Sequence, residues 1–285
     1  MTIDEALRQA TADAARGVVT FPADLHGFPG TVHGGAVAAA FHRLTLPRPP
    51  VALLRGVPTA VPLGLRTSSE GTTARLALRQ GDRPLAEATL HRDGLTPPDI
   101  APLRAAWARH GQPEGEVPGT ATCVACGSAN PLALGARFLL NDRFLWRECV
   151  PPLTYRTREG AHPALALILL DELGWWLGAL AQQECGVTTD VQLTLFDALP
   201  AAPMMVLGDR AAVGADDDPR GRYSRTSGVL LGPDGTLLAT AEIRFAGSRA
   251  YTRRLIEPFL ATTSIDQLAR WFRSARDLVR REAPP

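Results

Sequence analysis

Two stretches of the chain repeat one pattern, and this repeat limits the folds that the sequence can adopt. Residues 30–44 (GTVHGGAVAAAFHRL) and residues 160–180 (GAHPALALILLDELGWWLGAL) each run from a histidine into small and aliphatic residues, which predicts a helix. His162 follows His33 by 129 residues, a distance typical of a domain and far too long for a solenoid repeat. The sequence therefore predicts two copies of one unit, each built around one long helix.

The two copies differ at the positions that carry polar groups. The first copy starts with residues 33–35 (His-Gly-Gly) and has His42 nine residues after its first histidine. The second copy starts with residues 162–164 (His-Pro-Ala) and has Asp171 nine residues after its first histidine, followed by Glu172. Each copy holds groups that the other lacks, so a site shared between the copies would be complete.

Segments with the composition of β-strands surround both helices, and turns containing Gly or Pro separate them. The expected strands lie at residues 18–21, 51–67, 73–79, 85–91, 133–140, 144–150, 187–196, 204–213, 221–231 and 237–245. Helices and antiparallel strands that are segregated in this way are typical of the α+β class. We therefore expect an α+β fold.

The chain divides into four parts by composition. Residues 1–94 hold the first copy, and residues 120–248 hold the second. Residues 95–119 are rich in Pro, Gly and charge around a short helix and are the expected linker. Residues 249–285 are an expected tail of two helices, whose amphipathic spacing predicts that it docks on the protein. Thr2 and Ser264 are the expected N-caps of the first and the last helix.

The composition argues against several classes of partner. The 285 residues carry a formal net charge of +1, which gives no support for binding to nucleic acid or to an acidic membrane. The most apolar window, residues 164–180, contains two acidic residues and predicts a buried helix rather than a membrane span. The N-terminus lacks the apolar segment of a secretory signal, and four cysteines fit a reducing compartment. We therefore expect a cytoplasmic protein.

Four motifs resemble those of hotdog-fold thioesterases of the phenylacetate-pathway type. They are residues 28–35 (FPGTVHGG), 123–132 (CVACGSANPL), 170–172 (LDE) and 186–192 (GVTTDVQ). The resemblance implies two tandem hotdog units, each a central helix wrapped by an antiparallel sheet, which form an intramolecular pseudo-dimer. Hotdog units often pair further, so a homodimer of such chains is left open.

In this family, each active site combines the helix N-terminus of one unit with the carboxylate of the other. The resemblance therefore implies a site built from both halves. It assigns Asp171, Gly34, His33 and Thr188 as catalytic residues and Gly35 and Trp175 as substrate-binding residues. A second site would combine residues 162–164 with His42. Because that site lacks the glycines and the acid, we expect one working site per chain.

Thioester hydrolysis needs these residue types. The N–H groups at a helix N-terminus are free and carry a positive dipole, so the Gly34 N–H is a suitable oxyanion donor. Such a donor contributes about 2.7–4 kcal/mol in other hydrolases. An apolar setting raises the pKa of a carboxyl group, which suits Asp171 as a base that activates water or as a nucleophile that forms an anhydride. Thr188 is suited to positioning the water.

Structural roles are the alternative for the same residues. Asp171 could be a buried acid that is paired with backbone groups, and His33 could orient a loop. Gly34 and Gly35 could serve only close packing of a helix. Glu172 points to another face of its helix and is expected to be an ion-pair partner.

The motif Cys123-x-x-Cys126 suggests zinc, but a structural zinc site needs four ligands. Cys149 and Cys185 are distant in sequence and form no second motif of this kind. We therefore expect a metal-free turn, no bound metal, and no cofactor apart from CoA as part of the substrate.

Three functions follow from the resemblance and its alternatives. The first is a thioester hydrolase that acts on an acyl-CoA or on an acyl-carrier-protein thioester. The second is a non-catalytic protein that binds acyl thioesters. The third is a hotdog hydratase for enoyl-CoA, which Asp24 and His26 fit poorly because they lie too near His33. The acyl group is left open, with Trp175, Trp176 and residues 54–62 as candidates for its pocket.

Overall fold

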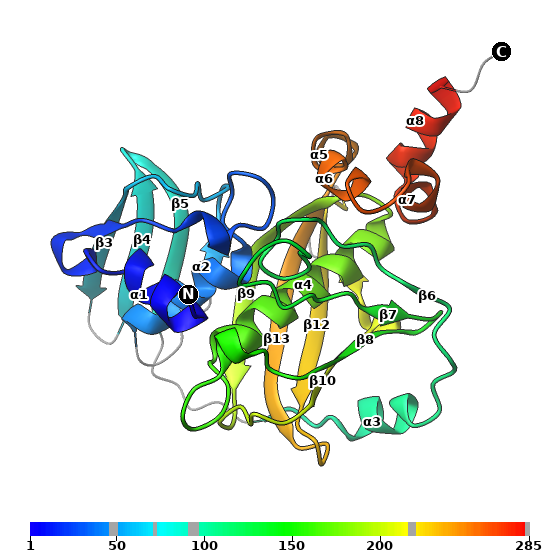
Figure 1. Ribbon diagram of the computed structural model, residues 1–285, viewed down its shortest axis with the longest axis horizontal. Helices are drawn as coiled ribbons and strands as arrows, with labels where there is room; N and C mark the ends of the chain where they lie inside the picture. The colour runs from blue at the N-terminus through cyan, green and yellow to red at the C-terminus, as the bar shows by residue number, and fades with distance from the viewer. Residues whose placement is uncertain (46–50, 71–72, 91–96, 216–220, 283–285) are drawn as a thin grey trace.

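One continuous antiparallel sheet runs through the described part of the protein, with two central helices packed against it (Figure 1). The computed structural model describes residues 1–45, 51–70, 73–90, 97–215 and 221–282. The helices are α1 (Ile3–Ala10), α2 (Gly34–Leu44), α3 (Ala101–Trp107), α4 (Ala164–Gln182), α5 (Arg249–Leu255), α6 (Glu257–Leu260), α7 (Ile265–Trp271) and α8 (Arg273–Glu282). The expected α+β class is confirmed.

The strands follow the predicted segments closely in both halves. They are β1 (Val18–Val19), β2 (Val51–Leu53), β3 (Leu63–Glu70), β4 (Thr73–Gln80), β5 (Arg83–Leu90), β6 (Gly115–Glu116), β7 (Leu139–Leu140), β8 (Phe144–Cys149), β9 (Gly186–Leu195), β10 (Met204–Asp209), β11 (Gly214–Ala215), β12 (Tyr223–Leu231) and β13 (Leu237–Gly247). Their order is β1-β3-β4-β5-β2-β9-β13-β12-β10-β8-β7-β6, and β11 pairs with β12.

The two halves of the sheet meet where β2 pairs with β9. Val51 lies opposite Val191, and Ala52 lies opposite Asp190, in antiparallel register. Strand β2 follows the first central helix α2, and β9 follows the second central helix α4, so the two helices are brought together over this join. Figure 1 shows the first half in blue and cyan beside the second half in green to orange.

The two central helices cross at Gly35, where their backbones make close contact. A Cβ atom at this position would lie 2.4 Å from the carbonyl oxygen of Leu167 and 2.7 Å from the Cα of Ile168. Only glycine fits such an approach. The packing role considered for this glycine is therefore present in the structure, and it sets the distance between the start of α2 and the middle of α4.

Equivalent histidines stand just before the two central helices, each with its Nδ1 beside the backbone nitrogen two residues further on. His33 Nδ1 lies 3.1 Å from the Gly35 nitrogen, and His162 Nδ1 accepts a hydrogen bond from the Ala164 N–H at 3.1 Å. The bond to His162 satisfies one of the N–H groups that a helix leaves unpaired in its first turn. The correspondence that the sequence repeat predicted between the two histidines is confirmed in their local geometry.

Helix α4 is the core helix of the protein. By length and composition it could cross a membrane, but 94% of its apolar window is buried inside the protein. Asp171 and Glu172 in its middle are only 3% and 8% exposed. The prediction of a buried helix is confirmed, and the two acids are buried with it.

Three predicted strands differ from the structure. Residues 51–67 split into β2 and β3, separated by a segment with Pro58 and Pro62, which lack the N–H that a strand ladder requires. Residues 133–140 form a strand only at β7, because the N–H groups of Leu134 and Ala136 donate to carbonyls of the cysteine turn. The strand predicted at residues 204–213 ends at Asp209, whose carboxylate caps a short 3₁₀ turn.

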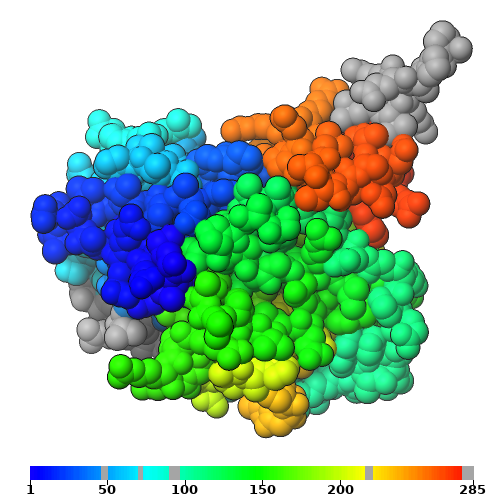
Figure 2. Space-filling model, viewed as in Figure 1, coloured from blue at the N-terminus to red at the C-terminus, as the bar shows by residue number. Residues whose placement is uncertain are grey.

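The linker and the tail also contain more structure than expected. Strand β6 lies within the predicted linker and pairs with β7, and the boundary expected between residues 94 and 95 lies outside the described residues. The tail has four short helices instead of two. Pro258 lies in the first turn of one of them. Ser264 is an N-cap, as predicted, but of α7 rather than of the last helix. The tail docks on α4, where Phe272 stacks on Trp176 at a ring distance of 6.0 Å. Figure 2 shows the tail, in orange, against the green second half.

Candidate active site

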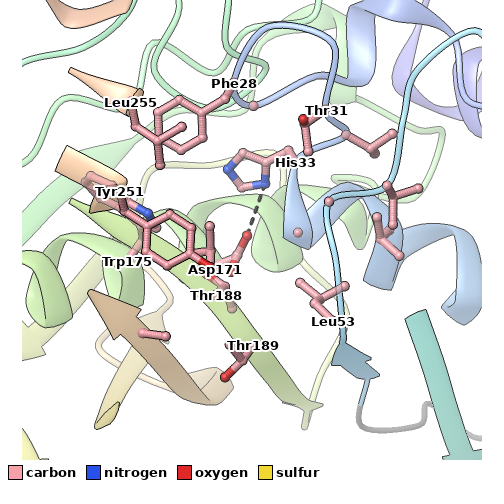
Figure 3. A pocket seen from close by; sticks show the side chains of 18 of the residues that line it. Phe28, Thr31, His33, Leu53, Asp171, Trp175, Thr188, Thr189, Tyr251 and Leu255 are labelled. Atoms are coloured by element: carbon pink, nitrogen blue, oxygen red, sulfur yellow. Dashed lines mark ion pairs between the residues drawn. The ribbon is translucent and has the colours of Figure 1, made fainter. Parts of the chain in front are cut away.

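A cavity of about 480 Å³ lies between the start of α2, the middle of α4, the start of β9 and the tail (Figure 3). Its lining combines a polar base with apolar and aromatic walls. The residues that line it are Gly27, Phe28, Thr31, Val32, His33, Gly34, Val37, Leu53, Leu54, Arg55, Gly56, Val57, Arg83, Thr120, Cys123, Cys126, Asp171, Glu172, Trp175, Val187, Thr188, Thr189, Tyr223, Ala246, Tyr251, Arg254, Leu255 and Phe259. Both halves of the chain therefore contribute to one cavity.

The structure places five of the six predicted site residues on this cavity. His33 and Gly34 come from the first half, and Asp171, Trp175 and Thr188 come from the second. The sixth residue, Gly35, lies just behind the wall, where its N–H donates to Asp171 rather than facing the cavity.

The carboxylate of Asp171 is held at one oxygen and unpaired at the other. Its Oδ2 accepts a hydrogen bond from the Gly35 N–H at 2.7 Å and lies 3.2 Å from His33 Nδ1. Its Oδ1 is buried and has no hydrogen-bond partner among the described residues. Burial raises the pKa of this carboxyl group above its usual range, opposed by the His33 charge, by the nearby Thr188 side chain and by the hydrogen bond from the Gly35 N–H.

His33 lies between two carboxylates. Its Nδ1 faces Asp171, and its Nε2 lies 3.2 Å from Oε2 of Glu172. Burial by itself would lower the pKa of His33, but the hydrogen bond to Glu172 and the negative charge of Asp171 outweigh burial and raise the pKa to about 9. The ion-pair role expected for Glu172 is confirmed, and both acids line the cavity, although their side chains reach opposite nitrogens of the His33 ring.

The Gly34 N–H is the first of helix α2. Among the described residues, no acceptor takes this N–H, as is typical of the first position of a helix. A Cβ atom at Gly34 would lie 2.7 Å from Asp171 Oδ2 and 2.8 Å from Leu53 Cδ1. The glycine therefore leaves a free N–H beside the Asp171 carboxylate, where a larger residue would collide with Asp171 and Leu53.

An irregularity in the sheet positions Thr188. The register between β9 and β13 shifts at this point, so that Asp190 lies opposite Arg244 and Thr188 lies opposite Phe245. The residue between them, Thr189, donates its hydroxyl to the carbonyl of Arg244 at 3.1 Å. Such bulges re-aim side chains near active sites, and this one leaves both threonines on the cavity wall beside Asp171.

Aromatic side chains form the wall opposite Leu53. The ring centroid of Trp175 lies 6.0 Å from that of Phe28 and 6.1 Å from that of Phe259 in the tail. The Trp175 Nε1–H donates to the carbonyl of Gly186 at 2.9 Å, which fixes the orientation of its ring. Trp176, the other tryptophan considered for the acyl pocket, does not line the cavity.

Three arginines line the cavity, and each comes from a different segment. Arg55 follows β2, Arg83 begins β5, and Arg254 lies on α5. All three are exposed, and within the described residues no acidic side chain forms an ion pair with any of them. The cavity therefore presents unneutralised positive charge to a ligand.

The corresponding position in the other half is closed by α1. His162 lies 3.7 Å from Asp4 of that helix, and Asp4 also binds Arg43 at 3.0 Å. Burial lowers the pKa of His162, opposed by Asp4. Neither His162 nor His42 lines the cavity described above.

Sequence reasoning missed Arg83, Arg254, the cysteine turn and the tail as parts of the cavity, whereas Arg55 lies in the predicted range 54–62. Glu172 was next to Asp171 and could have been assigned from the helical spacing, but the others lie in separate segments. Arg254 and Phe259 belong to the tail, and Cys123 belongs to the segment after the predicted linker. Their only local signal was the Cys-x-x-Cys motif.

No protein-family model matches the chain, and no curated protein matches it by sequence. Solved structures match it in fold. A conserved protein of unknown function with a hot dog fold from Alicyclobacillus acidocaldarius is 13% identical, with a TM-score of 0.50 over 85% of this chain and 98% of that one.

Two further structures are described as putative thioesterases. The protein from Thermobifida fusca is 16% identical, with a TM-score of 0.51 over 87% of this chain and 99% of that one. The protein from Novosphingobium aromaticivorans is 17% identical, with a TM-score of 0.50 over 81% and 94%. At these identities the likeness concerns the fold alone: the chain has a hotdog fold.

Proposed function

We propose that the protein is a thioesterase that hydrolyses an acyl-CoA or acyl-carrier-protein thioester in one composite site between its two halves. One observation carries this proposal: the unpaired Oδ1 of buried Asp171 and the free N–H of Gly34 meet on the same cavity. The first is a base without a partner, and the second is a donor without an acceptor. Two of the structural neighbours are described as thioesterases, which agrees with this chemistry.

The proposed reaction needs both groups at once. The carbonyl oxygen of the thioester accepts a hydrogen bond from the Gly34 N–H, which stabilises the oxyanion that develops during attack. Asp171 Oδ1 takes a proton from water, and the water oxygen forms a bond to the carbonyl carbon. The carbon–sulfur bond then breaks, the thiolate leaves and takes up the proton, and the products are a carboxylic acid and a thiol.

The neighbouring residues hold this pair in place. His33 and the Gly35 N–H bind the other oxygen of the carboxylate, which leaves Oδ1 as the oxygen without a partner among the described residues. Thr188 lies beside the carboxylate and is suited to holding the attacking water. Asp171 is 3% exposed, so the proposed base works where bulk water is largely excluded.

The charge of the cavity favours CoA as the carrier of the acyl group. Phosphate groups bind well to arginine, and Arg55, Arg83 and Arg254 line the cavity without acidic partners among the described residues. CoA has more phosphate groups than the phosphopantetheine arm of a carrier protein. The aromatic wall around Trp175 suits an apolar acyl group.

The test is thiol release from short-chain, long-chain and aromatic acyl-CoAs, measured for the wild type, Asp171→Asn and the matched control Asp197→Asn. Asp197 is exposed and does not line the cavity. Loss of turnover by roughly 10²–10⁴-fold in Asp171→Asn alone is the expected result. Full activity of that variant would overturn the proposed mechanism.

A protein that binds acyl thioesters without hydrolysing them is the second candidate. The observation that favours it is the pairing of Asp171 Oδ2 with the Gly35 N–H, which is also what a purely structural acid would show. Acyl-CoA binding by calorimetry without turnover on any substrate would support this candidate. The hydratase has less support, because neither Asp24 nor His26 lines the cavity.

The cytoplasmic location and the homodimer stay predictions. All four cysteines are free and buried, which is compatible with a reducing compartment.

A further inference from the structure

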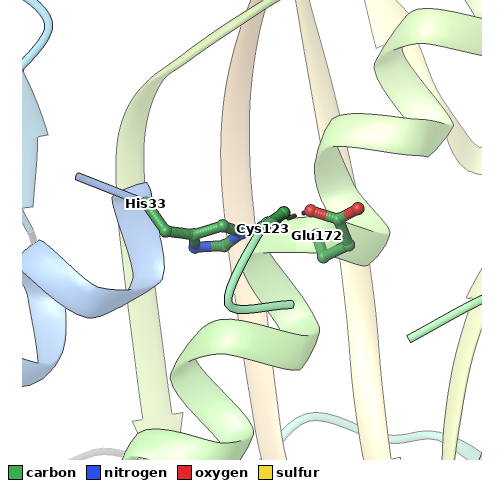
Figure 4. Close-up of side chains that lie close together, drawn as sticks. All are labelled: His33, Cys123 and Glu172. Carbon is green, nitrogen blue, oxygen red and sulfur yellow. Dashed lines mark hydrogen bonds and ion pairs between the residues drawn. The ribbon is translucent and has the colours of Figure 1, made fainter. Parts of the chain in front are cut away.

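The cavity contains a cluster of metal-ligand side chains that the proposed hydrolysis does not use as a set. A ring nitrogen of His33, the Sγ of Cys123 and a carboxylate oxygen of Glu172 all lie within 4.8 Å of one another (Figure 4). The three residues are 6%, 4% and 8% exposed. They come from the start of α2, the cysteine turn and the middle of α4, so the fold brings them together from three separate segments.

We propose that His33, Cys123 and Glu172 bind a zinc ion whose fourth coordination position faces the cavity. The donor set of one thiolate, one imidazole and one carboxylate suits zinc, which binds sulfur, nitrogen and oxygen ligands. Sites with three protein ligands and one open position are typical of zinc that contacts a substrate or water. All three residues line the cavity, so the open position is accessible to a ligand there.

The spacing of the two best-placed ligand atoms matches that of a tetrahedral zinc site. His33 Nε2 lies 3.2 Å from Glu172 Oε2. Two ligands that each bind tetrahedral zinc at about 2.0–2.1 Å lie roughly 3.3 Å apart. A zinc ion could therefore replace the proton between these atoms with little movement of either side chain.

The cysteine turn is built to present a sulfur atom. The Ala125 N–H donates to the Sγ of Cys123 at 3.3 Å, and the Gly127 N–H donates to the Cys123 carbonyl at 2.9 Å. A Cβ atom at Gly127 would lie 2.3 Å from that carbonyl oxygen, so only glycine closes this turn. N–H donors favour the thiolate form, which is the form that binds metals.

His33 also has the second partner that zinc-binding histidines commonly have. Such histidines usually donate their other ring N–H to a carboxylate, which fixes the ring. The Nδ1 of His33 lies 3.2 Å from Asp171 Oδ2. The sequence predicted a metal-free turn, because Cys123 and Cys126 alone do not make up a set of zinc ligands. The fold places two further possible ligands, His33 and Glu172, beside Cys123.

The test is the zinc content of the purified full-length chain, measured by plasma mass spectrometry after growth in zinc-supplemented medium and purification without chelators. Stoichiometric zinc is expected in the wild type and in the matched control Cys149→Ser. Cys149 is also buried, but it lies on β8 outside the cluster. At least a roughly tenfold loss of zinc is expected in Cys123→Ser and in Glu172→Gln.

A second measurement separates metal binding from folding. Cobalt added to the metal-free wild type is expected to give a thiolate-to-cobalt charge-transfer band, which Cys123→Ser lacks while its circular dichroism is unchanged. Cys126→Ser is expected to keep its zinc. Loss of zinc in that variant would mean that Cys126 is a fourth ligand, and it would overturn the proposal that the fourth coordination position is open to the cavity.

A wild type without zinc and without a cobalt band, or a Cys123→Ser variant with as much zinc as Cys149→Ser, would overturn the site. Metal content is measured without any thioester, so this result is independent of whether the protein is a thioesterase.

Discussion

The Gly35 N–H donates a 2.7 Å hydrogen bond to Oδ2 of Asp171, although the two residues are 136 positions apart in the chain. This bond joins the start of α2 to the middle of α4 at the point where the two helices touch. It occupies one carboxylate oxygen and leaves the other, Oδ1, without a partner among the described residues. The packing of the core and the proposed base are therefore set by the same contact.

We expect Gly34→Ala to reduce thioester hydrolysis strongly while the protein stays folded. The new methyl group would lie 2.7 Å from Asp171 Oδ2 and 2.8 Å from the end of the Leu53 side chain. It would displace the carboxylate and obstruct the proposed oxyanion position, and loss of such a donor typically costs 10²–10³-fold in kcat. Thiol release, with circular dichroism to check the fold, is the measurement. Unchanged kcat in this variant would argue against the Gly34 N–H as the oxyanion donor.

Gly35→Ala is expected to act on stability instead. Its methyl group would meet backbone atoms of Leu167 and Ile168, which cannot move aside as a side chain can. Overpacking of this kind typically costs about 1–3 kcal/mol. Urea unfolding of this variant should therefore show a lower free energy of unfolding than the wild type.

The matched control for both glycine variants is Gly111→Ala. A Cβ atom at Gly111 has nothing within 4 Å. Its stability and activity should equal those of the wild type, and a Gly35→Ala variant as stable as this control would contradict the close helix crossing.

Arg254→Ala is expected to raise the KM for acyl-CoA by about fivefold with little change in kcat, because loss of a charged hydrogen bond to phosphate at an exposed position costs about 1 kcal/mol. The next residue, Arg253, is also exposed but does not line the cavity, so Arg253→Ala is the matched control. The measurement is the steady-state KM of both variants for acyl-CoA and for the corresponding acyl-pantetheine, which lacks the phosphates. Only Arg254→Ala should raise the KM for acyl-CoA. An equal change with both substrates would show that Arg254 does not contact phosphate.

Acid is expected to destabilise the protein through His162. Burial lowers the pKa of this histidine below its ordinary value of 6.5. The unfolded chain then binds the proton more readily than the folded chain, so stability is full above about pH 6.5 and falls as the pH drops below that value. The free energy of unfolding of the wild type, measured from pH 8 to pH 5, should fall more steeply than that of His162→Asn. His110→Asn, at an exposed histidine, should follow the wild type.

Local sequence determined the parts of the fold that depend on neighbouring residues. The N-caps at Thr2 and Ser264 were predicted because a cap involves residues only three positions apart. Both are present, although Ser264 caps α7 and not the last helix. Helix α4 followed from its apolar composition, and the correspondence of His33 with His162 followed from the repeat. The residues predicted for the site lie at the start of α2, in the middle of α4 and near the start of β9, and five of the six line one cavity.

Tertiary structure decided which of these groups meet. The pairing of β2 with β9 sets the two halves side by side, and no local pattern specifies that register. It brings His33 between Asp171 and Glu172, and loop and tail packing add Cys123 and Arg254 to the same cavity. Contacts between distant segments depend on the packing of the whole core, whereas helix periodicity and capping depend on the nearest residues. For this reason the sequence by itself identified the elements and the acid, and only the folded chain showed what surrounds them.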